Sequence, residues 1–98
     1  MKPDKLILEL EEVVGKLGFK IRKEKGNFRG SNCVLDGERI IMLNKNYPVE
    51  MHIGTLAKFI LSQKHEELYL KPIVRKELEI VWERLEANNE PEFNFEGN

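Results

Sequence analysis

Two histidines and one cysteine are the residues of this chain that could bind a transition metal or form a nucleophile–base pair. His52 and His65 are thirteen residues apart, so even on one continuous helix they would point to different sides. A zinc site needs three or four convergent ligands, commonly in closely spaced pairs, and Cys33 supplies no such pair. The sequence therefore predicts no metal site, no cofactor and no catalytic residue of a recognised kind. An enzyme with an unrecognised site near His52 and Cys33 is kept as an alternative.

A basic segment in the first half of the chain is the second feature that could carry a function. It contains five cationic residues, namely Lys20, Arg22, Lys23, Lys25 and Arg29. On a strand, Lys20 and Arg22 would share a face and could bind nucleic acid or another anion. The whole chain carries 16 basic and 17 acidic residues, and exposed strands are commonly protected by Lys and Arg against pairing with other chains. A solvated, protected strand is therefore the first interpretation, and anion binding is the alternative.

Apolar side chains recur at the helical period in three stretches, which predicts three helices. The first covers about residues 4–17, and Gly18 is placed to form a left-handed C-terminal cap. The second begins near Pro48 and ends near Gln63. The third begins at Pro72, and its apolar face consists of Val74, Leu78, Val81, Trp82 and Leu85. Because Trp82 shares this face with Leu78, we expect its indole to be largely buried.

Between the first two predicted helices the period changes to two, which is typical of strands. Phe19 to Arg22 alternates apolar and basic residues, and Asp36-Gly37 is a strong signal for a two-residue hairpin turn. Ile40 to Leu43 is apolar on both faces, as a central strand would be. We therefore expect an α+β fold in the order α-β-β-β-α-α, in which a small antiparallel three-stranded meander packs with three helices.

The length and composition fit one small domain. The chain has 98 residues, of which 41% are hydrophobic and 34% are charged, and a domain of this size buries one modest core. We expect a single α+β domain over residues 1–89 and an acidic tail over residues 90–98. The single cysteine fits a reducing compartment, and no apolar run approaches the ~18 residues that a membrane span needs. The expected location is therefore the cytoplasm, without membrane contact.

Part of the sequence resembles a known enzyme family. An apolar strand that ends in Asn44, followed by a loop and a helix with Thr55-Leu56-Ala57, resembles the core of the ImmA/IrrE-type zincin-like metallopeptidases. The corresponding helix of that family reads roughly T-L-A-H-E-L-G-H. Here Lys58 stands in place of the first zinc-binding histidine, Phe59 in place of the catalytic glutamate and Ser62 in place of the second histidine. The resemblance thus implies a zincin-like core whose zinc-binding motif is lost, and it transfers no catalytic role.

The chain from about residue 5 to residue 85 also resembles a group of small uncharacterised bacterial proteins. The shared features are a C-x-x-D-G hairpin, here Cys33 to Gly37, a Leu-Asn-Lys strand end and a Pro-x-x-Arg helix start, here Pro72 to Arg75. That group has no assigned activity. The resemblance therefore implies a bacterial source and a shared fold, and it names no substrate.

The function that these observations favour is that of a non-catalytic protein-interaction module. A three-stranded sheet with three helices has few elements left to cover its second face, so the acidic tail or a second copy of the chain would have to cover it. The expected partner is therefore a protein, with a homodimer as one form, and nucleic acid is the less favoured partner. The expected interface consists of Ile40, Met42, Phe59, Phe93 and Phe95.

Overall fold

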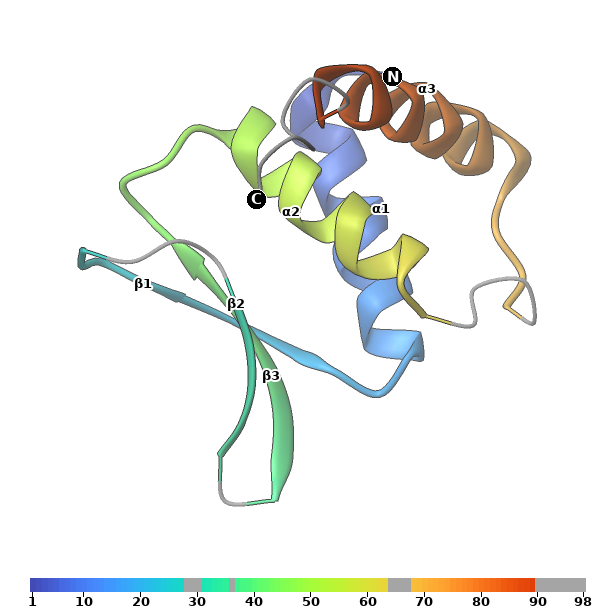
Figure 1. Cartoon of the computed structure of the whole chain (residues 1–98). Coiled ribbons are helices and arrows are strands. Elements are labelled where there is room, and N and C mark those ends of the chain that lie inside the picture. The colour runs from blue at the N-terminus through green and yellow to red at the C-terminus, as the bar shows by residue number, and fades with distance from the viewer. Residues whose placement is uncertain (28–30, 36, 64–67, 90–98) are drawn as a thin grey trace.

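The computed structural model describes residues 1–27, 31–35, 37–63 and 68–89 of the chain. In these parts, three helices and three strands follow one another as α1 (Pro3–Lys16), β1 (Lys20–Glu24), β2 (Ser31–Leu35), β3 (Glu38–Asn44), α2 (Val49–Leu61) and α3 (Pro72–Asn89) (Figure 1). Over the same residues, no helix combines the length and the apolar composition that crossing a membrane requires. Arg29 and the acidic tail over 90–98, which includes Phe93 and Phe95, lie outside the described residues.

The three described strands form one mixed sheet in the order β1-β3-β2. β2 and β3 are antiparallel, and Leu35 pairs with Glu38, so the predicted two-residue hairpin loop lies between them, with Gly37 at a φ of +80°. β1 pairs with β3 and runs parallel to it. The pairing begins with Lys20 opposite Ile40 and ends with Glu24 opposite Asn44. The prediction of an antiparallel three-stranded meander is therefore wrong, because β1 pairs with the third strand rather than with the second.

The apolar character of β3 explains this order. Ile40, Ile41 and Leu43 are all buried, as expected for the strand that has a neighbour on each side. β1 has a single apolar residue, Ile21, among four charged ones, which suits an edge strand. A meander and the observed sheet share the same strand directions and differ only in which strand lies in the middle. Since the hairpin turn attaches β2 to one edge of β3, the other edge is free for β1.

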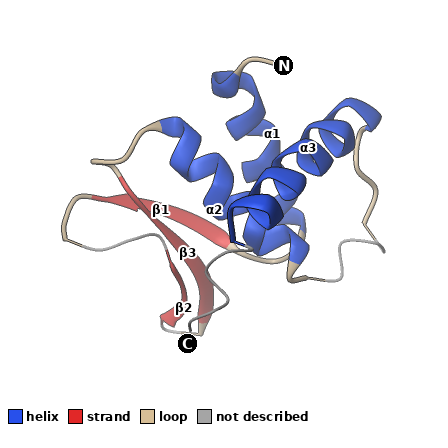
Figure 2. Ribbon diagram, turned by 45° about the horizontal axis from the view of Figure 1, so that its top comes forward, coloured by secondary structure: helices blue, strands red, loops and turns tan. Residues whose placement is uncertain are grey.

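All three helices lie on one side of this sheet (Figures 1 and 2). α1 contacts α2 and β1, and α3 contacts α1 and α2. Ile41 and Leu43 of β3 belong to the same buried cluster as Leu10 of α1, Leu56 of α2 and Leu78 of α3. The fold is therefore a sheet, a layer formed by α1 and α2, and an outer helix α3 that rests on that layer.

A glycine forms the turn between α1 and β1. Gly18 has a φ of +93°, its N–H donates to the Gly15 carbonyl at 3.0 Å, and the N–H of Phe19 donates to the Val14 carbonyl at 3.2 Å. This geometry confirms the left-handed C-terminal cap predicted at Gly18. The turn brings Phe19 back against the helical core, where it packs as a partly buried side chain.

The apolar face of α3 is buried at one end of the helix only. Val74 and Leu78, in the first half, are buried, whereas Val81, Trp82 and Leu85 are only partly buried. Trp82 packs against the core cluster but is less buried than Leu78, so the expectation of a largely buried indole is met only in part. In the part of the chain that the structure describes, the second half of this apolar face is thus left partly open to solvent.

Candidate functional site

The carboxyl ends of β1 and β3 meet at one edge of the sheet, a position at which α/β proteins commonly bind ligands. Asn44, the last residue of β3, is only 1% exposed there. Its Nδ2 donates to the Gly26 carbonyl at 2.7 Å, and its Oδ1 accepts the N–H of Asn46 at 2.9 Å. Its own carbonyl accepts a hydrogen bond at 2.8 Å from Nε2 of His52, which must carry the hydrogen because a carbonyl oxygen only accepts. These contacts tie two loops to α2, and they give Asn44 and His52 a structural role.

The structure does not bring His52 and Cys33 together. Cys33 pairs with Ile40, which lies four residues before Asn44 and therefore about 13 Å away from it along β3. His52 binds at the Asn44 end of that strand. A general base must lie within hydrogen-bond reach of the group that it deprotonates, directly or through one water. The alternative of an enzyme site at these two residues gains no support from this geometry.

The basic segment is divided between the two faces of the sheet. Lys20 and Arg22 lie on the face away from the helices, whereas Lys23 reaches α1 on the helical side. All three form ion pairs, at 2.7 Å for Lys20–Glu38 and at 3.1 Å for both Arg22–Glu24 and Lys23–Glu11. A carboxylate beside each cation reduces the positive potential that an anionic ligand would meet. Lys25 is exposed just beyond β1. Anion binding by this segment therefore stays a prediction, and the ion pairs weaken the argument for it.

The residues expected to form a protein interface lie at separate places. Ile40, at 3% exposed, and the half-buried Met42 alternate with the core residues of β3, so they belong to the sheet face away from the helices. Phe59 of α2 lies on the helical side and packs edge-on against Phe19, with 4.6 Å between the ring centroids. The two sets therefore do not form one continuous surface. A homodimer through the sheet face stays a prediction.

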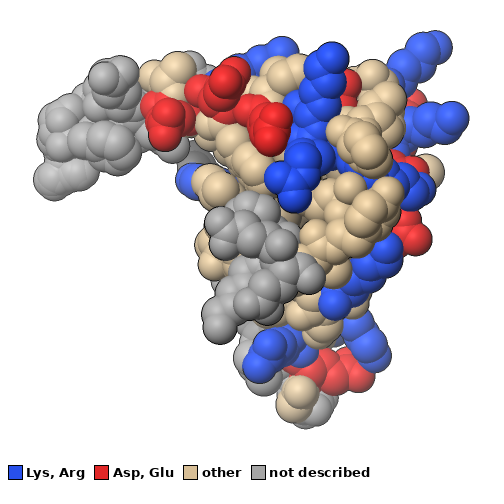
Figure 3. Space-filling view, turned by 90° about the vertical axis from the view of Figure 1, so that its right-hand side faces the viewer, with Lys and Arg blue, Asp and Glu red and all other residues tan. Residues whose placement is uncertain are grey.

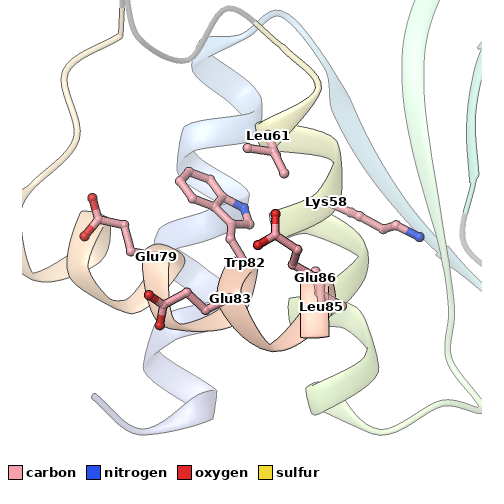
Figure 4. Close-up of a pocket in the computed structure, with 7 residues that line it drawn as sticks. All are labelled: Lys58, Leu61, Glu79, Trp82, Glu83, Leu85 and Glu86. Atoms are coloured by element: carbon pink, nitrogen blue, oxygen red, sulfur yellow. The ribbon is translucent and has the colours of Figure 1, made fainter. Parts of the chain in front are cut away.

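A groove of about 570 Å³ lies between α2 and α3 (Figure 4). Its apolar lining consists of Leu61 from α2 and of Trp82 and Leu85 from α3. Leu61 is 49% exposed, and the other two are half-buried. The indole Nε1–H of Trp82 donates to the carbonyl of Ala57 in α2 at 2.7 Å, which fixes the ring in the groove. The volume falls within the range of pockets that bind small molecules or side chains of a partner.

Acidic side chains surround this apolar lining. Glu79, Glu83 and Glu86 of α3 line the groove together with Lys58 of α2. Figure 4 shows the three carboxylates around Trp82, whereas the ammonium of Lys58 points away from them. On the face of the molecule shown in Figure 3, acidic side chains gather along the upper edge, and elsewhere they lie next to Lys and Arg. The groove is thus apolar in its centre and negative at its rim.

The groove residues are not evident from the sequence. Glu79, Glu83 and Glu86 recur at the helical period beside the apolar face of α3, and this is the signal that was available. Such a charged row usually means only that one side of a helix faces water. It becomes part of a groove here because Leu61, from a different helix, lies opposite Trp82.

The purified protein is expected to contain no stoichiometric zinc. Over the residues that the structure describes, no three His, Cys, Asp or Glu side chains are grouped as metal ligands. The imidazole of His52 is already engaged with the Asn44 carbonyl. Elemental analysis after dialysis measures the metal content, and about one zinc per chain would contradict this prediction, since a structural zinc site needs three or four ligands.

The positions that a zincin-like enzyme would use for catalysis have other surroundings in this structure. Lys58 is exposed at the groove, Phe59 packs on Phe19, and Ser62 is the C-cap residue of α2. The hydroxyl of Ser62 donates to the Phe59 carbonyl at 2.6 Å.

Comparisons of the chain with protein-family models, with curated proteins and with solved structures find no match. The zincin-like resemblance therefore stays a prediction, and function has to be inferred from the geometry of the groove.

Proposed function

We propose that this chain is a non-catalytic protein-interaction domain that binds a segment of another protein in the groove between α2 and α3. The observation that carries this proposal is the partly exposed apolar lining formed by Leu61, Trp82 and Leu85. Concave sites lined mainly by apolar and aromatic side chains, with a few polar groups, are typical of binding sites. A tryptophan held in a fixed orientation is also the kind of residue that contributes most to binding in protein interfaces.

The charged groups of the groove favour binding over catalysis. Glu79, Glu83 and Glu86 are all exposed side chains of a single helix. A carboxyl group that acts as a general acid near neutral pH is usually buried against apolar groups, which these three are not. These glutamates are better placed to select a partner by its charge than to transfer a proton to a substrate.

The proposal includes a cytoplasmic location in a bacterium. The chain has one cysteine and so forms no disulfide within itself, which is usual for proteins of reducing compartments. Docking in the groove does not use Ile40 or Met42, so a homodimer through these residues is compatible with it.

Intrinsic fluorescence tests the proposed groove directly, because Trp82 is the only tryptophan of the chain. The probe is an amphipathic peptide of about 15 residues with a leucine stripe and an uncharged glutamine face. Binding should remove water from the partly exposed indole and shift its emission to shorter wavelength. Leu61→Gln should weaken the affinity for this peptide by about tenfold, or ~1.4 kcal/mol.

The matched control for this test is Leu8→Gln. Leu8 is an exposed leucine of α1 and is not part of the groove lining. Its substitution should leave the affinity unchanged, and circular dichroism should show both variants folded. An emission spectrum that does not respond to the peptide, or equal losses of affinity in the two variants, would contradict docking in this groove.

A further inference from the structure

We infer that the segment bound in the α2–α3 groove is an amphipathic helix whose polar side carries lysine or arginine, an inference that rests on the docking function proposed above. The groove is open between two helices, and a helix lying in such a groove is a recurrent way of recognising a peptide. The charge of the groove, the spacing of its glutamates and its size each favour a cationic helix over other occupants.

The charge of the groove is the first reason. The described residues of its lining carry three carboxylates, from Glu79, Glu83 and Glu86, and one ammonium, from Lys58, so their formal charge is −2 (three negative charges minus one positive). The ammonium of Lys58 points away from the carboxylates (Figure 4). The C-terminal end of α3, which carries no basic residue in its last turn, adds a partial negative charge from the helix dipole. A cationic partner would thus be attracted, and an acidic one repelled.

The spacing of the three glutamates is the second reason. They stand at positions i, i+4 and i+7 of α3, so they form a row over two turns, about 10 Å long. A single compact cation would be held best by carboxylates that converge on one point. A row of charges along a helix instead matches a row of cations at the same period on a second helix.

The size and chemistry of the centre are the third reason. The groove volume of about 570 Å³ is larger than one side chain requires. Trp82 and Leu61 face it from opposite helices, so an apolar stripe on the partner would pack between them. The face of an indole also attracts the cationic groups of lysine and arginine. A helical segment with leucines on one side and cations on the other could pack its leucines on the apolar centre and pair its cations with the acidic rim of the groove.

The test compares three peptides that share one leucine stripe and differ in whether their polar side carries lysine, glutamine or glutamate. We expect the lysine peptide to bind about tenfold more tightly than the glutamine peptide, because exposed ion pairs are weak singly and three act together here. The glutamate peptide should bind most weakly. The advantage of the lysine peptide should shrink when the salt concentration rises from about 0.05 M to about 0.5 M, since salt screens exposed charges.

A pair of protein variants with equal net charge separates the groove from the overall charge of the chain. The first replaces Glu79, Glu83 and Glu86 with glutamine, and it should bind the lysine and glutamine peptides equally. The control replaces Glu12, Glu24 and Glu38, which lie outside the groove lining, with glutamine, and it should keep the preference for lysine. Circular dichroism verifies that both variants are folded.

The possible outcomes distinguish this inference from the proposed function. Equal binding of all three peptides, with Trp82 still responding, would overturn the cationic partner and leave the groove as a docking site. No binding of any peptide would overturn both. Spermidine that binds as tightly as the lysine peptide and displaces it would overturn the helical partner in favour of a small polyamine.

Discussion

Replacing Leu78 with alanine is expected to lower the free energy of unfolding by about 3–5 kcal/mol. Leu78 lies in the buried half of α3, is 0% exposed and belongs to the core cluster shared with α1, α2 and β3. Alanine would remove apolar contacts and leave a cavity where the outer helix meets the rest of the fold. Because a chain of this length is typically stable by about 5–15 kcal/mol, this loss would be a large fraction of the total.

Ile80→Ala is the matched control for Leu78→Ala. Ile80 lies two residues further along the same helix but is 38% exposed, so its truncation should change the stability by less than about 1 kcal/mol. Urea denaturation followed by circular dichroism measures both values. If the two substitutions lowered stability equally, the packing of α3 described here would be contradicted, and with it the shape of the groove.

Replacing Asn44 with leucine is expected to lower the free energy of unfolding by about 2–4 kcal/mol. The side chain is buried, and it both donates to the Gly26 carbonyl and accepts the N–H of Asn46. Leucine has a similar size but can make neither bond, so it would leave these two backbone groups without their partner. The loops after β1 and after β3 would then be held less firmly at the edge of the sheet.

The control for Asn44→Leu is Asn46→Ala, which removes the side chain of an exposed loop residue but keeps the backbone N–H that donates to Asn44. Its effect on stability should be within about 0.5 kcal/mol. Amide hydrogen exchange should also show faster opening of the residue 45–47 loop in Asn44→Leu only. Equal exchange rates in the wild type and Asn44→Leu would contradict the role assigned to this side chain.

The local elements could be predicted because each leaves a regular signal in the sequence. The apolar period of residues 4–17 agrees with α1 to within a residue at each end, and the apolar run Ile40 to Leu43 identifies β3 as the central strand. Gly18 and Gly37 both have positive φ at predicted turns. These signals arise from interactions between residues that are close in the chain, or from burial of the whole segment.

The sheet order and the groove could not be predicted because both depend on contacts between distant residues. The apolar run of β3 indicates a central strand, but the strand directions are the same in a meander, so the sequence does not exclude pairing of β1 with β2. Trp82 and Leu78 share one face of α3, so periodicity treats them alike. Their different burial follows from where α3 crosses α2, which places Leu61 opposite Trp82 and leaves a groove between them.

Chemical-shift mapping of the amide signals during a titration with the lysine peptide tests docking in the α2–α3 groove most directly. The largest changes are expected at Lys58, Leu61, Trp82 and Glu86, and at the single indole N–H signal of the chain, which belongs to Trp82. Changes centred on Ile40 and Met42 of the sheet face, or an unchanged spectrum at saturating peptide, would contradict the assignment of this groove as the binding site.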